Sequence, residues 1–341
     1  MRLVIYLLAS LVLFAPARAQ VERPHEDGFA AYLPVLRAQA ERAGISQRTI
    51  ANVLPTLTFN PRVVELDRGQ PGGPSNPNAI PPFFPYERQH VTPDLIARGQ
   101  SRYQALRPRL ADIERRYGVS PSVIIAIFGH ETSYGAVTGD FDLLRAFATL
   151  AYEGRRRQLF TDEFIATLRL LDRGYSRAQL QGSWAGATGY PQFLPSVFLR
   201  LGVDGDGDGR SDIWRSQADA LASIGNYLSN AGWKPRTPWG VRVSVPASLD
   251  RAGIANAGNS PRCPRVHARH SRWMTMREWR ALGIVPTAGY LADTEMASLL
   301  EPDGPNARAF LLTSNYRTIL DYNCSNFYAL SVGLLADAVA R

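Results

Sequence analysis

The stretch Ser120-Pro-Ser-Val-Ile-Ile-Ala-Ile-Phe-Gly-His-Glu131 decides the fold expected for this chain of 341 residues. A serine followed by a proline is typical of the first turn of a helix. At about 100° per residue, Ile124, Ile127 and Phe128 share one apolar stripe, and Glu131 lies in the middle of it. The sequence therefore predicts a buried helix that carries a carboxyl group among apolar side chains.

The position of Glu131 allows two interpretations. An ionised carboxylate in an apolar stripe is desolvated, which raises its pKa and favours the protonated form that a general acid needs near neutral pH. A structural glutamate paired with one of the many arginines explains the spacing equally well. His130 lies off the stripe and has no histidine or cysteine partner at metal-ligand spacing, so we interpret it as a helix-edge residue.

Most of the chain around this helix has a helical pattern. We expect two or three short helices in residues 28–68, with Ser46 as an N-cap, and a single helix from Thr92 to about Tyr117 that ends at Gly118. Further helices are expected at about 142–151, 161–173, 195–201, 216–231 and 315–341, and a strand is expected at 241–245.

These elements predict a mainly α fold in several parts. The predicted parts are a signal peptide (1–19), a helical N-terminal part (20–69), a proline-rich loop (70–91), a helical core (92–235 plus 310–341) and an irregular insert with some β structure (236–309). The loop is expected because six prolines and two glycines fall between Gln70 and Pro85.

A second informative stretch is Gln181-Gly-Ser-Trp-Ala-Gly-Ala-Thr-Gly-Tyr-Pro-Gln-Phe-Leu-Pro-Ser196. Polar Ser183 and Gln192 alternate there with Trp184, Tyr190 and Phe193. Sugars bind through hydrogen bonds and flat apolar faces, so the mixture suits a glycan groove. Taken alone, however, the stretch fits a tight, glycine-rich packing turn better.

The third stretch, Asp204-Gly-Asp-Gly-Asp-Gly-Arg-Ser-Asp212, resembles the start of an EF-hand loop. Carboxylates of Asp204, Asp206 and Asp208 and the carbonyl of Arg210 fit the first four calcium ligands. Arg215 stands where a bidentate glutamate belongs, and the downstream Asp219 is the candidate replacement. The sequence therefore predicts a structural Ca²⁺, with a metal-free Asp/Gly turn as the alternative.

The N-terminus has the pattern of an export signal. Arg2 precedes an apolar run to Phe14 that is shorter than the roughly 18 residues of a membrane span, and Ala17-Arg18-Ala19 fits a signal peptidase site. The residue after this site is Gln20, whereas a lipid anchor needs cysteine. We expect a periplasmic protein with no transmembrane segment in the mature chain.

Charge and cysteine content fit that location. The formal charge of +8 becomes +6 when Arg2 and Arg18 are removed, and Lys234 is the single lysine. With no basic run and no nucleic-acid motif, an anionic cell-wall polymer is a better partner than nucleic acid. An oxidising compartment permits a disulfide between Cys263 and Cys324, and two buried thiols are the alternative.

Together these stretches resemble the lytic murein transglycosylases of the B type. The resemblance covers residue 28 to the C-terminus and rests on five motifs in order. They are Gly129-His-Glu-Thr-Ser-Tyr-Gly135, the stretch from Gly182 to Ser196, Asp204-Gly-Asp-Gly-Asp-Gly-Arg-Ser-Asp-Ile-Trp214, Asn226-Tyr-Leu-Ser-Asn-Ala-Gly-Trp233 and Tyr322-Asn-Cys-Ser-Asn-Phe-Tyr-Ala-Leu-Ser-Val332.

The resemblance implies a lysozyme-like helical core and Glu131 as the sole acid/base, with no cofactor for catalysis. It also implies that the sugar groove is lined by Ser183, Gln192, Tyr227, Tyr322 and Asn323. Tyr86 matches more weakly, as do Arg155 and Arg156, which are expected to meet the peptide stem. Peptidoglycan strands are the implied substrate, and other cell-wall enzymes are candidate partners.

The implied reaction needs one carboxyl group. Glu131 protonates the oxygen between N-acetylmuramic acid (MurNAc) and N-acetylglucosamine (GlcNAc), and its carboxylate then deprotonates the 6-hydroxyl of the muramic sugar, which closes a 1,6-anhydro ring. The alternatives are a hydrolytic muramidase with Asp140 or Asp142 as second carboxylate, and a non-catalytic peptidoglycan-binding protein.

Overall fold

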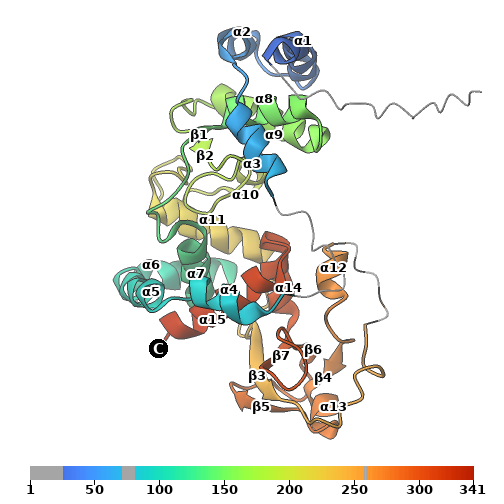
Figure 1. Ribbon diagram of the computed structural model, residues 1–341. Helices are drawn as coiled ribbons and strands as arrows, with labels where there is room; N and C mark the ends of the chain where they lie inside the picture. The colour runs from blue at the N-terminus through green and yellow to red at the C-terminus, as the bar shows by residue number, and fades with distance from the viewer. Residues whose placement is uncertain (1–25, 71–80, 257, 259, 261) are drawn as a thin grey trace, which may run out of the picture.

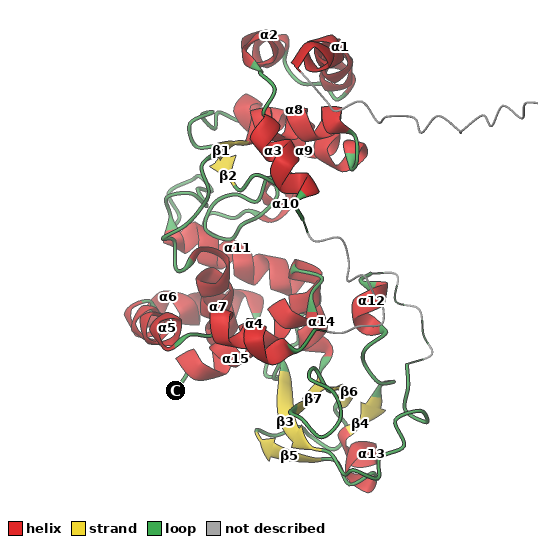
Figure 2. Ribbon diagram, viewed as in Figure 1, coloured by secondary structure: helices red, strands yellow, loops and turns green. Residues whose placement is uncertain are grey.

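A computed structural model describes residues 26–70, 81–256, 258, 260 and 262–341. The predicted signal peptide and residues 71–80 of the proline-rich stretch lie outside the described residues. The described chain is mainly helical with two small antiparallel sheets, so the predicted mainly α, lysozyme-like fold class is confirmed (Figure 2). Its helices and five-stranded sheet form three stacked parts, each with its own hydrophobic cluster (Figure 1).

The first part, which we call the N-terminal cluster, combines helices from two regions of the sequence. Ser46 caps its second helix, as predicted, and its hydroxyl also donates to Asp172 Oδ1 at 2.7 Å, which ties the N-terminal helices to a later one. The N-terminal helices are thus packed against part of the predicted core. The elements are α1 (Glu26–Arg42), α2 (Gln47–Val53), η1 (Leu54–Thr56), α3 (Pro61–Arg68), α8 (Leu143–Glu153), α9 (Arg157–Asp172) and α10 (Pro195–Leu201).

The second part, the central cluster, is built around the helix that carries Glu131. Every residue of this helix from Val123 to Gly129 is buried. The helix is therefore buried all round, and not along one stripe, because helices pack against it from several sides (Figure 1). The elements are α4 (Phe83–His90), α5 (Pro93–Ala105), α6 (Arg107–Tyr117), α7 (Pro121–Thr132), α11 (Gln217–Asn230), α14 (Ser314–Tyr322) and α15 (Asn326–Val339).

Several predicted boundaries were wrong. The predicted loop at 70–91 contains α4, whose first amides, those of Phe83 and Phe84, donate to the carboxylate of Asp303 at 2.6 and 3.1 Å. Because this cap is some 220 residues away, local sequence does not reveal it. Helix α9 begins at Arg157, four residues before the predicted start.

Two predicted long helices are each divided in two. The expected helix from Thr92 to Tyr117 breaks at Leu106, because Pro108 belongs in the first turn of a new helix rather than in a helix interior. The expected closing helix is interrupted at Asn323, which is extended with φ −145° and ψ 120°, before Ser325 caps α15.

The third part is a five-stranded antiparallel sheet in the order β4-β6-β7-β3-β5. The buried side chain of Trp279 packs on this sheet and donates from Nε1 to Ala297 O at 3.0 Å. The predicted insert ended at residue 309, but β7 continues to Leu312, so that boundary was placed too early. The elements are β3 (Gly240–Ser244), α12 (Pro264–His267), β4 (Met274–Thr275), α13 (Met276–Ala281), β5 (Val285–Ala288), β6 (Met296–Leu300) and β7 (Ala309–Leu312). The second sheet pairs β1 (Phe141–Asp142) with β2 (Gln181–Gly182).

A disulfide links the insert to the central cluster. Cys263, immediately before α12, is bonded to Cys324, between α14 and α15, with the two Cα atoms 5.6 Å apart. Nearby, His270 Nε2 lies 2.8 Å from Asn326 Oδ1 in the first turn of α15. The extended Asn323 backbone is thus held next to a covalent crosslink.

We expect reduction of this disulfide to lower the melting temperature. The crosslink spans 61 residues, and the loop-closure entropy it removes from the unfolded chain corresponds to about 4 kcal/mol. Calorimetry with and without a reductant measures the effect, and the Cys263→Ser/Cys324→Ser variant, which has nothing to reduce, is the control. Equal melting temperatures for the oxidised and reduced protein would contradict the prediction.

Candidate active site

Glu131 lies in the last turn of α7, beside α15. Tyr328 Oη donates to Glu131 Oε1 at 2.6 Å. Burial raises the pKa of Glu131 to about 7, although the hydrogen bond from Tyr328 acts in the opposite direction. Near neutral pH the carboxyl group therefore exists in both protonation states, as an acid/base requires.

Tyrosines form a row that leads to Glu131. Tyr328 is 3% exposed. The ring of Tyr322 is nearly parallel to that of Tyr328, with centroids 6.4 Å apart, and Tyr227 lies 4.7 Å from Tyr322. Tyr227 and Tyr322 pack against both the N-terminal and the central cluster, so the row lies where these two parts meet.

The hydroxyl groups of Tyr227 and Tyr322 are fixed by the backbone. Tyr322 Oη donates to Pro191 O at 2.6 Å, and Tyr227 Oη donates to Asp321 O at 2.7 Å. Burial raises the pKa of Tyr322 well above its ordinary value, and the charge of Glu131 acts in the same direction. Both tyrosines therefore stay neutral and keep their rings in place.

Tyr86 approaches Glu131 from α4. Its pKa is raised by burial and, to a smaller extent, by the negative charge of Glu131. The ring of Tyr86 stacks on that of His90 at 3.7 Å, and His90 stacks on His130 at 5.4 Å. The structure thus places the weakly matched Tyr86 close enough to Glu131 for the charge of Glu131 to affect its pKa.

His130 is half-buried in the last turn of α7 and contacts α15. Its Nε2 lies 2.8 Å from Ser331 Oγ, and its ring meets Tyr328 edge-on at 4.7 Å. Burial, with a contribution from His90, lowers the pKa of His130 to about 4. His130 is therefore a neutral packing partner of the tyrosine that binds Glu131.

The glycine-rich stretch after β2 is a folded loop closed by its own polar groups. Ser183 Oγ accepts from Ala187 N at 3.0 Å. Gln192 has a positive φ of 51° and donates from Nε2 to Gly189 O at 3.0 Å and Thr138 O at 3.2 Å. Asn323 is exposed beside the disulfide. The contacts of Ser183 and Gln192 hold the loop together, and its neighbour Pro191 contacts Tyr322.

Arg155 and Arg156 are paired with the N-terminal cluster. Both guanidinium groups bind the fully buried Asp67 on α3: Arg155 Nε donates to Oδ2 at 2.8 Å, and Arg156 Nη2 donates to Oδ1 at 2.5 Å. The two hydrogen bonds lower the pKa of Asp67 against the opposing effect of burial, which is the largest single influence. No contact between these arginines and Glu131 occurs among the described residues.

The candidate second carboxylates are poorly placed to activate water. Asp142 caps α8, where its Oδ1 accepts from Arg145 N at 3.0 Å, and its Oδ2 accepts from Arg177 Nε at 2.7 Å. Asp140 is exposed in the loop before β1. The hydrogen bonds of Asp142 therefore weigh against the hydrolytic alternative.

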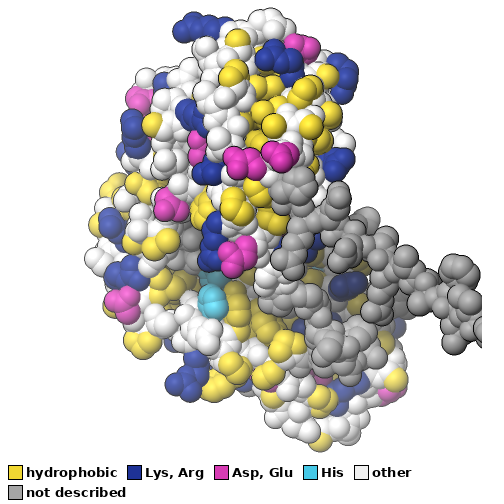
Figure 3. Space-filling model, turned by 45° about the horizontal axis from the view of Figure 1, so that its top comes forward, with side chains coloured by type: hydrophobic (Ala, Val, Ile, Leu, Met, Phe, Trp, Pro, Cys, Tyr) yellow, Lys and Arg dark blue, Asp and Glu magenta, His cyan; other side chains and the backbone are white. Residues whose placement is uncertain are grey.

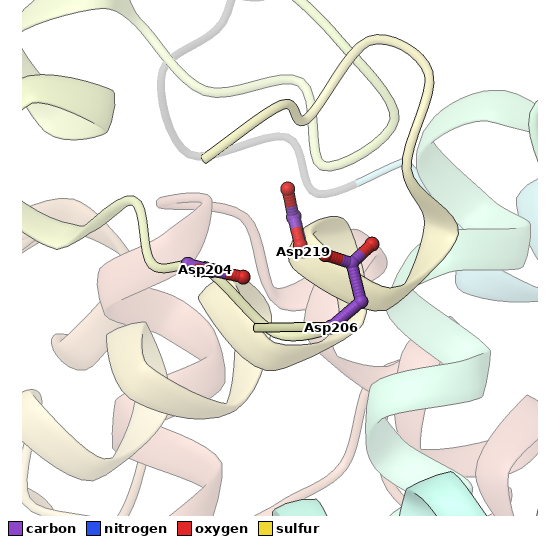
Figure 4. Close-up of side chains that lie close together, drawn as sticks. All are labelled: Asp204, Asp206 and Asp219. Atoms are coloured by element: carbon purple, nitrogen blue, oxygen red, sulfur yellow. The ribbon is translucent and has the colours of Figure 1, made fainter. Parts of the chain in front are cut away.

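The acidic loop brings three of its predicted metal ligands together. Carboxylate oxygens of Asp204, Asp206 and Asp219 lie within 4.8 Å of one another, with Asp219 on α11 facing the loop (Figure 4). Asp219 is fully buried, and its burial raises the pKa of its carboxyl group despite hydrogen bonds from the amides of Gly205 and Asp212. A buried carboxylate beside two others suits a cation that neutralises it.

The carboxylate of Asp208 is not part of this cluster. Asp208 is exposed, and its Oδ1 accepts from Arg210 N at 2.8 Å. The side chain of Arg210 points elsewhere, since its guanidinium lies 4.4 Å from the ring of Tyr175 and donates to Gly174 O. The carbonyl of Arg210, and not this side chain, was the predicted ligand.

The surface mixes both signs of charge. In Figure 3, basic and acidic side chains alternate over the visible face, and no large area of described residues carries one sign. None of the described helices has the length and apolar character needed to cross a membrane.

Tyr328 is the important residue that the sequence analysis missed. It lies within the last of the five motifs, six residues after Tyr322, but nothing in that stretch distinguishes it from the neighbouring Phe327 as a packing residue. The pairing with Glu131 joins residues 197 positions apart and exists only in the folded chain.

Comparisons with known proteins agree with this geometry. Residues 28–337 match the family described as the transglycosylase SLT domain. Membrane-bound lytic murein transglycosylase B of Escherichia coli is 30% identical over 311 residues, which are 90% of this chain and 77% of that protein.

Solved structures show the same fold. SltB3 of Pseudomonas aeruginosa, in complex with NAG-anhNAM-pentapeptide, superimposes with a TM-score of 0.81 at 36% identity over 92% of this chain and 79% of that one. Escherichia coli Slt35 in complex with calcium has a TM-score of 0.72 at 27% identity over 94% of each chain. The resemblance inferred from the motifs is confirmed. The chain therefore belongs to the lytic transglycosylases that carry the transglycosylase SLT domain, enzymes that act on the glycan strands of peptidoglycan.

Proposed function

We propose that Glu131 is the sole acid/base of a lytic transglycosylase that cleaves the MurNAc–GlcNAc bond and leaves 1,6-anhydro-MurNAc ends. The observation that carries the proposal is the buried carboxyl group of Glu131, with its pKa raised to about 7 and its Oε1 bound to Tyr328. The SltB3 complex with a NAG-anhNAM ligand supports the same outcome, since it contains an anhydro sugar.

In the first step, protonated Glu131 gives its proton to the glycosidic oxygen, which leaves as the hydroxyl of GlcNAc. Positive charge develops on the anomeric carbon of MurNAc, and the neighbouring 2-acetamido group stabilises it. Glu131 is then a carboxylate, which the Tyr328 hydroxyl stabilises by donating a hydrogen bond.

In the second step, the Glu131 carboxylate takes the proton of the 6-hydroxyl of the same MurNAc. The oxygen attacks the anomeric carbon and closes the anhydro ring, so Glu131 ends the cycle protonated. Because the nucleophile is part of the substrate, no second carboxylate is needed to activate water, and Asp142 is free to act as a helix cap.

The groove residues are proposed to hold the sugars. The rings of Tyr227 and Tyr322 offer apolar faces, and their hydroxyls are already committed to the backbone. Ser183, Gln192 and Asn323 are proposed to supply polar groups around them, and Tyr86 is proposed to contribute from α4. Arg155 and Arg156, fixed by Asp67, are proposed to meet the peptide stem.

The acidic loop is proposed to hold a structural Ca²⁺. Asp204, Asp206 and Asp219 supply clustered carboxylates, and Asp208 with the carbonyl of Arg210 completes an EF-hand-like set. The Slt35 complex with calcium supports this reading. The ion supplies positive charge to the loop and takes no part in the reaction.

The site of action is proposed to be the periplasm. The apolar segment from Leu3 to Phe14 and the Ala17-Arg18-Ala19 site support cleavage of a signal peptide after export. Peptidoglycan is the proposed partner there, and other cell-wall enzymes are further candidates.

We expect Glu131→Gln to lower the turnover of peptidoglycan by about 10²–10⁴-fold, because glutamine can accept the Tyr328 hydrogen bond but cannot transfer a proton. Mass spectrometry of digested sacculi measures the yield of anhydro ends. The matched control is Glu114→Gln, on the exposed face of α6, which should keep full activity. Products with reducing ends, or clear activity in Glu131→Gln, would contradict the mechanism.

We expect turnover to fall as the pH rises through about 7, because the first step needs protonated Glu131.

Stability should follow the same titration. The pKa of Glu131 is raised in the folded state, so its stabilising contribution is complete below the unfolded value of 4.5 and is lost as the pH approaches about 7. Above pH 7, Glu131→Gln should therefore be more stable than wild type by roughly 3 kcal/mol. Parallel unfolding curves at pH 5 and 8 test the sign.

We expect Ca²⁺ to raise the melting temperature and a chelator to lower it. At a free concentration of 100 times Kd, binding stabilises by about 2.7 kcal/mol. Asp219→Asn should abolish this response, whereas Asp112→Asn, on the exposed surface of α6, should preserve it. A melting temperature indifferent to both Ca²⁺ and chelator would exclude the site.

A further inference from the structure

The turn that follows Glu131 has a strained backbone. Ser133, with φ 52° and ψ 45°, and Tyr134, with φ 62°, both adopt the left-handed conformation. Each such residue costs about 1–2 kcal/mol when it is not glycine. Two in succession, directly after the catalytic residue, persist only because the surroundings hold them.

Arg98 on α5 holds the first of these residues. Its Nη1 donates to Ser133 O at 3.1 Å and its Nη2 donates to Ser133 Oγ at 2.8 Å. The third nitrogen, Nε, donates to Asp94 Oδ2 at 2.9 Å, one turn earlier on the same helix. The guanidinium group is thus fixed to its own helix through Nε and binds the turn through Nη1 and Nη2.

The second left-handed residue is held between α5 and α7. The Arg98 guanidinium lies 5.6 Å from the centre of the Tyr134 ring, and Tyr134 Oη donates to Leu95 O at 2.9 Å. A Cβ at Gly129 would lie 2.5 Å from the Tyr134 ring, and one at Gly99 would lie 2.3 Å from its hydroxyl oxygen. Only glycine at both positions lets the ring fit there.

This turn controls the end of α7 on which Glu131 stands. The last helical hydrogen bonds run from Ser133 N to Gly129 O at 2.8 Å and from Tyr134 N to Phe128 O at 3.3 Å, so they enclose Glu131. Within the described residues, the Glu131 carboxylate accepts one side-chain hydrogen bond, from Tyr328. The orientation of the Glu131 carboxylate therefore depends on the backbone of the turn, to which Arg98 is hydrogen-bonded.

We propose that Arg98 is a positioning residue, which fixes the left-handed turn after Glu131 and thereby aims the carboxyl group at the glycosidic oxygen. The proposal rests on the proposed role of Glu131. Arginine suits this task because its planar fork reaches two oxygens of one residue at once, which a lysine ammonium cannot do in the same fixed geometry.

The test measures kcat, KM and the pH profile of Arg98→Gln on soluble glycan strands. We expect kcat to fall by at least about tenfold, because small misplacements of a catalytic group are costly, and KM to change by less than about twofold. The pH profile should also shift, because the carboxyl group no longer has its native surroundings. Arg98→Lys should recover only part of the loss.

Arg102→Gln is the matched control. Arg102 lies one turn further along α5 and makes no side-chain hydrogen bond or ion pair among the described residues. Its substitution removes the same charge and leaves the Arg98–Ser133 hydrogen bonds intact. It should leave kcat and the pH profile unchanged. An equal loss of kcat in both variants, or an unchanged kcat in Arg98→Gln, would overturn the proposal.

A double variant separates positioning from simple relief of strain. Glycine adopts the left-handed conformation freely, so Ser133→Gly in the Arg98→Gln background should restore the melting temperature. It should not restore kcat, because a flexible turn does not aim Glu131. Full recovery of kcat would show that Arg98 only stabilises the strained turn and does not position Glu131. Glu131→Gln in the same series keeps the two questions apart, since activity in that variant contradicts the proposed function and not the role of Arg98.

Discussion

Burial of the Glu131 carboxyl group is the condition on which the site depends. A carboxyl group among apolar side chains is stable only if it is protonated or receives hydrogen bonds. Tyr328 donates one such hydrogen bond and covers the carboxyl group with its apolar ring. The effect of burial on the pKa of Glu131 outweighs that of the hydrogen bond, so the pKa stays raised. The residues of α7 from Val123 to Gly129 are buried, so the helix that carries Glu131 is held firmly, and desolvation of the carboxyl group raises its pKa to about 7.

The other parts of the molecule act as supports for this one carboxyl group. The turn that Arg98 holds fixes α7 from one side, and α15 brings Tyr328 from the other. The disulfide at Cys324 and the cap on α4 from Asp303 attach the insert to the same assembly. The contacts of the insert limit where α4 and α15 can lie.

Helix α11 connects the acidic loop with the tyrosine row. Asp219 is in its first turn and Tyr227 lies two turns later. A cation bound by the loop would neutralise Asp219 and fix the start of the helix, which in turn restrains Tyr227 against Tyr322. This gives a physical reason for the proposed Ca²⁺ site in an enzyme whose proposed reaction uses no metal.

The sequence alone predicted the mainly helical fold, because hydrophobic periodicity and caps are local properties. It placed Glu131 in an apolar stripe, and the resemblance of the motifs to a known family made Glu131 the catalytic candidate. It also pointed to the acidic loop. Tertiary structure alone decided the cap that makes α4 a helix, the contacts of His130 with Ser331 and Tyr328, and the choice of Tyr328 as partner of Glu131. These features depend on contacts between residues far apart in the chain, whose free energies no local pattern contains.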